Sequence, residues 1–339
     1  MTTSSINTTA ESIRVTQTVN ETTSAEMDNI RMPDAYMKIA SGSVSVLGIV
    51  GNLIVIVVIS RSTMLRKTFT NILILNQSCI DFASSCCIMI TTTSRTQVEG
   101  LSGIMGEIYC RFWLSDLPLW SFMISSSYTL ILLTVERYIA IVYPIFHHTS
   151  FKRTTVLALA IAAWFPGFIY MLCFLVPTSG VTEGRCMIME IFASASWKKF
   201  TGVMLFIIQY LIPIAVFLTC YSRIIAHLRS RVHPQLPQSV GNEAVSIKSR
   251  ARRNVLKTLT IIVVCYLLCN SWNQFLFLAH NFGYPIDYSG AFYNFTVIAM
   301  FANSCINPII YVLKYEAYQK EFRKIFFKCG ANTPTVTTS

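Results

Sequence analysis

Long apolar runs separated by short polar segments dominate the chain. A bilayer core about 30 Å thick needs roughly 20 apolar residues for each helical crossing. Seven runs reach that length, at residues 40–59, 70–91, 108–142, 155–177, 200–226, 255–280 and 289–313. Lipid offers no partner for backbone N–H and C=O groups, and barrel strands would be shorter and would alternate. Each run is therefore predicted to be a membrane-spanning helix.

This pattern predicts an all-α membrane protein, a seven-transmembrane helix bundle over residues 38–313. Residues 1–37 are rich in Thr and Ser and are expected to form a disordered tail. After the seventh run, apolar residues recur at three- and four-residue steps among basic ones, so residues 314–329 are predicted to form a short amphipathic helix on the membrane surface. Residues 330–339 are expected to form a closing tail.

The distribution of charge predicts the orientation. Only 13% of the 339 residues are charged, against about 25% in soluble domains. Segments on the side of the C-terminus hold 19 of the 27 Lys and Arg, whereas the other side holds 11 of the 16 Asp and Glu. Because Lys and Arg accumulate in cytoplasmic loops, the N-terminus is expected to be extracellular. The net charge of +11 then describes a cytoplasmic surface suited to anionic lipid and acidic partners, with no nucleic acid expected.

Cysteine usage and sequence motifs predict three kinds of covalent modification. Eight of the eleven Cys lie within predicted helices, where a thiol usually packs as a small apolar group. Of the other three, only Cys110 and Cys186 face an oxidising compartment, so a disulfide between them is expected. Cys329 follows the amphipathic segment and is a palmitoylation candidate, although an unmodified thiol fits equally well. Asn7 and Asn20 begin glycosylation motifs in the N-terminal tail.

One carboxylate, Asp81, lies deep within a predicted helix. An ionised group there costs at least about 2.5 kcal/mol, so such residues often mark function. Ser126, Asn303 and Asn307 lie at similar depth, and the two Asn are four apart on one helix face. Carboxylate, hydroxyl and amide oxygens suit a hard cation such as sodium. The alternative is an interior Asp that is hydrogen-bonded to its neighbours without a cation.

A series of short motifs resembles the rhodopsin-like (class A) G-protein-coupled receptors from about residue 51 to residue 329. The motifs are Gly51-Asn52, Asn76 with Asp81, Glu136-Arg137-Tyr138, Trp164, Pro213 with Tyr221, and Asn307-Pro308-Ile309-Ile310-Tyr311. The resemblance implies a plasma-membrane receptor, not an enzyme, that binds an extracellular ligand and activates a heterotrimeric G protein. It also implies arrestin as a partner, and it places Asp81, Ser126, Asn303 and Asn307 where the family binds an inhibitory sodium ion. No other cofactor is expected.

The resemblance also implies a cytoplasmic switch. Arg137 is expected to be held by Glu136 at rest and released toward the G protein, with Tyr138 completing the motif. Tyr221 and Tyr311 resemble the two tyrosines that swing toward this Arg on activation. Each member of the Glu–Arg pair could instead be a simple interfacial anchor.

Helices three and six depart from the family pattern. Residues 269–272 read Cys-Asn-Ser-Trp where the family has Cys-Trp-x-Pro, so helix six is expected to be straighter or to bend by another route, with Trp272 a candidate replacement for the family Trp. Cys110 precedes Arg137 by 27 residues, two more than is common, which predicts a bulge near Pro118. Arg252 stands where some members place an acid, so an ionic latch to helix six is not expected.

The outer half of the bundle indicates the class of ligand. The Asp of amine receptors is replaced by Leu119, although Asp116 one turn higher keeps that question open, and residues 289–313 contain no Lys for a retinal Schiff base. Aromatic and amide side chains prevail there, namely Trp120, Asn273, Gln274, Phe277, Tyr293 and, in the last outer loop, Asp287. This set resembles the neuropeptide branch near galanin or allatostatin receptors. A non-peptide small molecule is the alternative ligand, and interfacial packing alone also explains single aromatics.

Two other classes of membrane protein fit the sequence poorly. A transporter would show internal repeats with interrupted helices in matching positions, and these seven unequal runs do not. An intramembrane protease would need a second catalytic group near Asp81, and the sequence offers none at that depth.

Overall fold

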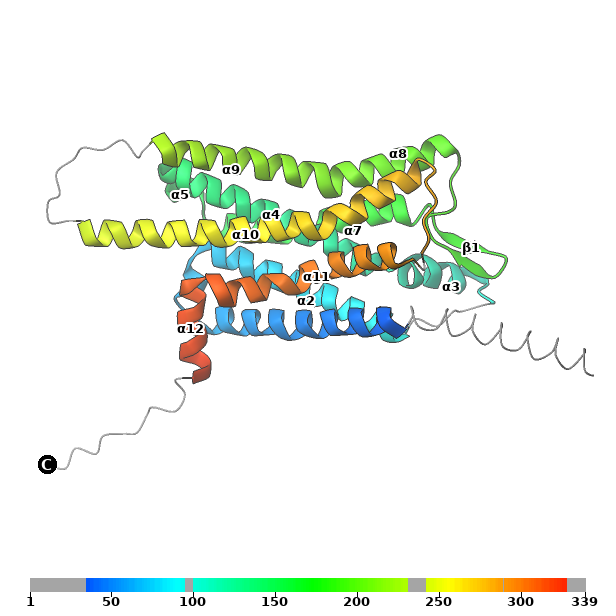
Figure 1. Cartoon of the computed structure of the whole chain (residues 1–339), viewed down its shortest axis with the longest axis horizontal. Helices are drawn as coiled ribbons and strands as arrows, with labels where there is room; N and C mark the ends of the chain where they lie inside the picture. Colours follow the sequence, from blue (N-terminus) through cyan, green and yellow to red (C-terminus); the bar gives the residue numbers. More distant parts are fainter. Residues whose placement is uncertain (1–34, 95–99, 231–241, 289, 328–339) are drawn as a thin grey trace, which may run out of the picture.

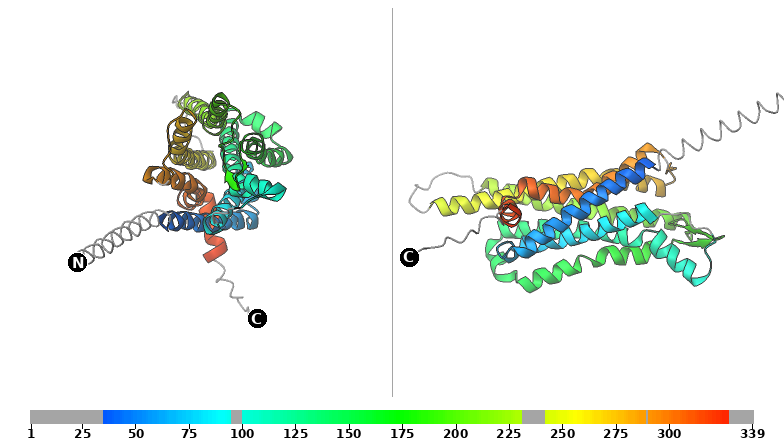
Figure 2. Two further views of the ribbon diagram at one scale, coloured as in Figure 1. Left: turned by 90° about the vertical axis from the view of Figure 1, so that its right-hand side faces the viewer. Right: turned by 90° about the horizontal axis from the view of Figure 1, so that it is seen from below.

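The computed structural model describes residues 35–94, 100–230, 242–288 and 290–327, without the side chains of residues 230, 242–253 and 255. Within these ranges seven helices are long and apolar enough to cross a membrane: Ala35–Arg61, Phe69–Ser94, Gly103–Val142, Arg153–Leu175, Ala195–Arg229, Leu256–Asn281 and Ala291–Lys314. They pack side by side as one elongated bundle (Figures 1 and 2). The predicted seven-helix fold is confirmed. Asn7, Asn20 and Cys329 lie outside the described residues.

Several of the seven spans are built from more than one element. The second is α2 (Phe69–Ser94), preceded by the short turn η1 (Leu65–Lys67), and the third comprises α3 (Gly103–Ile108), η2 (Tyr109–Leu114) and α4 (Leu117–Val142). The fourth comprises α6 (Arg153–Ala162), α7 (Phe165–Tyr170) and η3 (Met171–Leu175), and the fifth α8 (Ala195–Phe206), η4 (Ile207–Leu211) and α9 (Ile212–Ser230). The sixth is α10 (Asn242–Asn281) and the seventh α11 (Ala291–Lys314). A short helix α5 (Pro144–Ser150) follows α4, and α12 (Glu316–Phe327) follows α11.

The two ends of the bundle carry different structures. Between the fourth and fifth spans, β1 (Gly180–Thr182) and β2 (Arg185–Met187) form an antiparallel hairpin beside α3. We call this the hairpin end. At the opposite end α12 lies across the bundle (Figure 1), and we call this the α12 end. The described chain starts at the hairpin end, at Ala35. The sequence did not predict the hairpin.

The third span contains the irregularity that its extra residues predicted. In η2 the turns are wide, and the Ser115 amide donates to the Cys110 carbonyl five residues earlier at 3.0 Å. Asp116 then adopts a left-handed backbone conformation (φ 55°), which is uncommon for a residue with a side chain. Pro118 follows in the first turn of α4, where its missing N–H costs nothing. The wide turn and the kink absorb the longer spacing from Cys110 to Arg137.

Asn52 replaces the hydrogen bond that Pro308 removes from α11. Proline has no N–H, so the carbonyl four residues earlier, at Ser304, loses its helical donor. The Asn52 side-chain amide donates to that carbonyl at 2.8 Å. A Cβ at Gly51 would lie 3.0 Å from the Cβ of Pro308, so the first helix approaches α11 closely because this residue is Gly. The Gly51-Asn52 motif is thereby explained by packing and backbone satisfaction.

Pro213 has an equivalent compensation in the fifth span. Its missing N–H frees the Gln209 carbonyl within the wide turn η4. The Tyr266 hydroxyl of α10 donates to this carbonyl at 2.7 Å. This bond ties the fifth span to the sixth at the level of the proline.

The sixth span lacks the family proline, and α10 runs as one uninterrupted helix. Asn270, which stands in place of the family Trp, is buried and donates to the Tyr266 carbonyl within the same helix at 2.9 Å. Trp272 is 48% exposed and packs edge-on against Phe295 on α11. Trp272 therefore does not replace the family Trp in the interior, because its side chain faces away from it.

Candidate functional site

A cavity of about 470 Å³ opens at the hairpin end between α4, α8, α10 and α11. Five of the six expected ligand-binding residues line it: Trp120, Asn273, Gln274, Phe277 and Tyr293. Asp287 is not among the lining residues. It lies in the turn before α11, where its backbone carbonyl accepts from the Gly290 amide at 3.1 Å.

The cavity also contains ionisable side chains, of which only Asp116 had been considered as a partner of a ligand. Asp116, Glu190, Lys198 and His280 line it, and Lys198 Nζ lies 3.4 Å from His280 Nε2. Partial burial and, to a smaller extent, the Glu190 carboxylate raise the pKa of Tyr288, another lining residue. The helix-three offset had already raised Asp116 as a candidate counter-ion for an amine ligand. Glu190 and Lys198 were not predicted, because the loop after β2 and the first turn of α8 bring them to the cavity.

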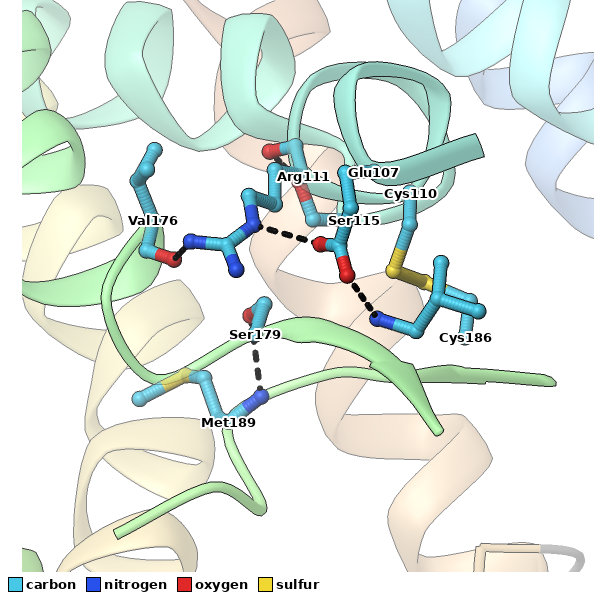
Figure 3. Close-up of a disulfide and its surroundings, with 9 residues drawn as sticks. Glu107, Cys110, Arg111, Ser115, Val176, Ser179, Cys186 and Met189 are labelled. Atoms are coloured by element: carbon cyan, nitrogen blue, oxygen red, sulfur yellow. Dashed lines mark hydrogen bonds and ion pairs between the residues drawn. A yellow bond between two sulfur atoms is a disulfide. The ribbon is translucent and has the colours of Figure 1, made fainter. Parts of the chain in front are cut away.

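A disulfide fixes the hairpin over this end of the bundle (Figure 3). Cys110 and Cys186 are bonded, with their Cα atoms 5.4 Å apart, which confirms the expected pairing. The Glu107 carboxylate reinforces the attachment, since it accepts from Arg111 Nε at 2.8 Å and from the backbone amide of Val181 at 3.2 Å. Because Cys186 itself lines the cavity, the hairpin forms part of the cavity wall.

The centre of the bundle contains the fully buried carboxylate of Asp81. Ser126 Oγ donates to Oδ1 at 2.8 Å and Asn307 Nδ2 to Oδ2 at 2.9 Å. Gln77, one helical turn earlier, donates Nε2 to both oxygens at 3.2 and 3.1 Å. Asn303 is buried, but no hydrogen bond joins it to Asp81 in the described structure. Three of the four expected residues are thus brought together, and Gln77 was missed although its spacing of four residues on α2 could have revealed it.

These side chains offer the ligand chemistry of a hard cation. No Lys, Arg or His among the described residues forms an ion pair with Asp81, so its charge is met only by neutral donors. The carboxylate and the Ser126 hydroxyl supply oxygens of the kind that sodium accepts. The Gln77 Oε1 atom is also buried and has no hydrogen-bond partner. The residues fit a small monovalent cation, provided that the Gln77 N–H group moves away from the carboxylate.

At the α12 end, Glu136 binds Arg137 in a buried cluster. Arg137 Nε donates to Glu136 Oε2 at 2.5 Å, and a second guanidinium nitrogen contacts Oε1. The Thr70 hydroxyl donates to Oε2 at 3.2 Å, and His147 Nε2 on α5 lies 2.9 Å from Oε1. The His147 ring stacks on Phe151. His147 was not among the predicted site residues, and the side chain of Arg252 lies outside the described ones.

The three tyrosines of the expected switch are placed around this cluster. Tyr138 packs edge-on against Tyr143, and Tyr221 is half-buried against the apolar core. Tyr311 is fully buried, with its ring 6.4 Å from that of Tyr318 on α12. In the described structure neither Tyr221 nor Tyr311 hydrogen-bonds to Arg137. The guanidinium is engaged with its neighbouring acid.

A ligand-sized cavity at one end, a buried carboxylate at the centre and a Glu–Arg pair at the other end describe a seven-helix receptor. The family described as "7 transmembrane receptor (rhodopsin family)" matches residues 51–311. This chain therefore belongs to the rhodopsin-like (class A) G-protein-coupled receptors, which are receptors and not enzymes.

Within that family the chain is similar to peptide receptors. It is 29% identical over 286 residues to galanin receptor type 2 of Mus musculus, covering 82% of this chain and 72% of the relative. It is 26% identical over 284 residues to galanin receptor 2b of Danio rerio, covering 83% and 72%. It is 27% identical over 291 residues to somatostatin receptor type 2 of Mus musculus, covering 83% and 74%. The expected likeness to galanin receptors is confirmed.

Proposed function

We propose that this chain is a plasma-membrane receptor that binds an extracellular neuropeptide and activates a heterotrimeric G protein. The observation that carries the proposal is the cavity of about 470 Å³ at the hairpin end, at the opposite end of the bundle from the Glu136–Arg137 pair. The galanin and somatostatin receptors that resemble this chain are named for peptides. A bundle with these two ends can couple ligand binding on one side of a membrane to a protein on the other.

The hairpin end faces outward in this proposal. The Cys110–Cys186 disulfide supports it, because such bonds persist in oxidising compartments, and the excess of Lys and Arg toward the α12 end follows the positive-inside rule. An epitope tag on the N-terminus should be stained on intact cells, and one on the C-terminus only after permeabilisation. Staining of both tags on intact cells would contradict the proposed orientation.

The lining of the cavity supports a peptide ligand. Asp116 and Glu190 supply carboxylates for a basic group, and Asn273 and Gln274 supply amides that match the donors and acceptors of a peptide backbone. Trp120 adds an aromatic surface for an apolar side chain. The combination is richer in polar partners than an apolar small molecule requires.

The ligand is tested on cells that express the full chain, with a panel of synthetic neuropeptides that includes galanin and somatostatin and with G-protein nucleotide exchange as the readout. We expect one peptide class to activate exchange and Trp120→Ala to weaken its potency. Trp113→Ala is the matched control, since Trp113 is exposed and does not line the cavity. A response to non-peptide compounds alone, or equal loss in both variants, would contradict the proposal.

The proposal extends to the other partners of the receptor. A sodium ion at Asp81 would stabilise the resting state by binding it preferentially.

At the α12 end, Phe326 and Phe327 are exposed on α12, which suits contact with inner-leaflet lipid. Arrestin is proposed to share the G-protein face, and Cys329 is proposed to be palmitoylated. Asn7 and Asn20 are proposed to be glycosylated.

A further inference from the structure

The Gln77 side chain occupies the position from which a cation would approach Asp81. Its Nε2 lies 3.2 and 3.1 Å from the two carboxylate oxygens, and it also contacts Ser126 Oγ. A single amide nitrogen therefore touches both oxygens of the buried acid and the nearest hydroxyl. These are the oxygen atoms that a cation bound to Asp81 would need.

The orientation of this amide follows from charge. With Nε2 toward Asp81, the partial positive charge of the N–H group faces the carboxylate, whereas the reverse orientation would place Oε1 against two negatively charged oxygens. This orientation has a cost, because the Gln77 Oε1 atom is buried and has no hydrogen-bond partner. The amide leaves its own acceptor unsatisfied in order to donate to the acid.

A cation reverses the preference. A metal ion beside Asp81 would repel the N–H group and would compete with it for the same carboxylate oxygens. Gln77 is held on α2 only one turn from Asp81 and is almost fully buried, so it cannot leave the region without rearranging. A cation bound to the Asp81 carboxylate would therefore have to take the place of Nε2.

We propose that Gln77 is an internal substitute for the cation, which competes with a monovalent ion for the Asp81 carboxylate and so sets the sodium sensitivity of the receptor. The inference rests on the cation site of the proposed function. Gln77 keeps the acid satisfied when no ion is bound. Its presence lowers the affinity of the site for sodium, because the ion must break the two contacts that the amide makes.

The test is the thermal stability of the purified full-length chain as a function of NaCl, with choline chloride keeping ionic strength constant. Gln77→Leu and Gln77→Met replace the amide side chain with an apolar side chain of similar size. Hydrogen bonds to charged groups are strong, so we expect the half-maximal sodium concentration to fall by about tenfold in both variants. Two variants are used because either alone could fold poorly.

Asn76→Leu is the matched control. Asn76 is a neighbouring polar residue on α2, but it bonds to Thr129 and Trp164 rather than to Asp81, so its loss should leave the half-maximal sodium concentration unchanged. If wild type and both Gln77 variants respond at the same concentration, or the variants need more sodium, the role of Gln77 is refuted while the cation site stands. If none of the three responds, the cation site itself is refuted, and the inference with it.

Discussion

The two buried carboxylates of the described structure, Asp81 and Glu136, have opposite surroundings. Asp81 is met only by neutral donors, from Ser126, Asn307 and Gln77. Glu136, which is 2% exposed, is met by the guanidinium of Arg137 and by a histidine.

Burial alone therefore does not define what a buried acid does. An acid that forms an ion pair with a basic side chain, as Glu136 does with Arg137, can hold that side chain and later release it. An acid with neutral partners retains a demand for positive charge, which a mobile ion can meet. The first arrangement suits a switch, and the second suits a site that responds to ions.

The largest expected effect comes from removing the partner of Glu136. Arg137→Ala should reduce ligand-stimulated nucleotide exchange by at least about thirtyfold, because the group proposed to meet the G protein is lost. Ligand binding should be retained, since the cavity lies at the other end. Arg61→Ala, an exposed Arg at the α12 end, is the control and should change exchange little. If Arg137→Ala retained ligand-stimulated nucleotide exchange, the proposed role of Arg137 as a switch would be contradicted.

The next effect concerns Asp81. Sodium at about tenfold its Kd should raise the melting temperature of the wild-type protein by about 2–4 °C, and Asp81→Asn should abolish that rise. The substitution keeps the size of the side chain and removes the charge that attracts the ion. Differential scanning fluorimetry with and without NaCl, at constant ionic strength, measures it. An equal rise in both proteins would show that sodium acts elsewhere.

A smaller effect is expected at His147, which contacts Glu136 from α5 at 2.9 Å. His147→Ala removes one partner that positions the acid, so basal nucleotide exchange should rise by about two- to fivefold. His148→Ala is the matched control, because its side chain is exposed and adjacent in sequence. Equal changes in the two variants would indicate a general effect on the loop rather than on Glu136.

The smallest effect is expected at Thr70, whose hydroxyl lies 3.2 Å from Glu136. Thr70→Val preserves shape and removes one hydrogen bond, so stability should fall by about 1 kcal/mol and basal exchange should change by less than about twofold. Thermal unfolding and the exchange assay on the same preparation measure both quantities. A larger rise in exchange than that of His147→Ala would invert the order of the two contacts.

Much of the fold could be predicted from sequence because its signals are local. Apolar run length defines the seven spans, and the positions of Cys110 and Cys186 predict their bond. The two extra residues in helix three predicted an irregularity, which Asp116 and the wide turn provide. Five of the six residues predicted to bind ligand line the cavity, because the length of each apolar run also indicates which of its residues lie near the end of the helix.

The remainder depends on how distant segments meet. His147 reaches Glu136 because the short helix α5 packs against α4, and Glu190 enters the cavity because the disulfide fixes the hairpin there. Trp272 could not be placed because the choice of helix face near residue 270 depends on packing against α11. Gln77 is different, since its spacing from Asp81 is readable in the sequence.

The bond from Tyr266 to the Gln209 carbonyl has a consequence for motion between the fifth and sixth spans. If the fifth and sixth spans separate at this level, the Gln209 carbonyl oxygen loses its donor, and lipid offers no replacement. A water molecule would have to enter as the phenol leaves. Entry of water beside the Gln209 carbonyl is therefore coupled to separation of the two helices. The occupancy of water at this position would measure how far the fifth and sixth spans have moved apart.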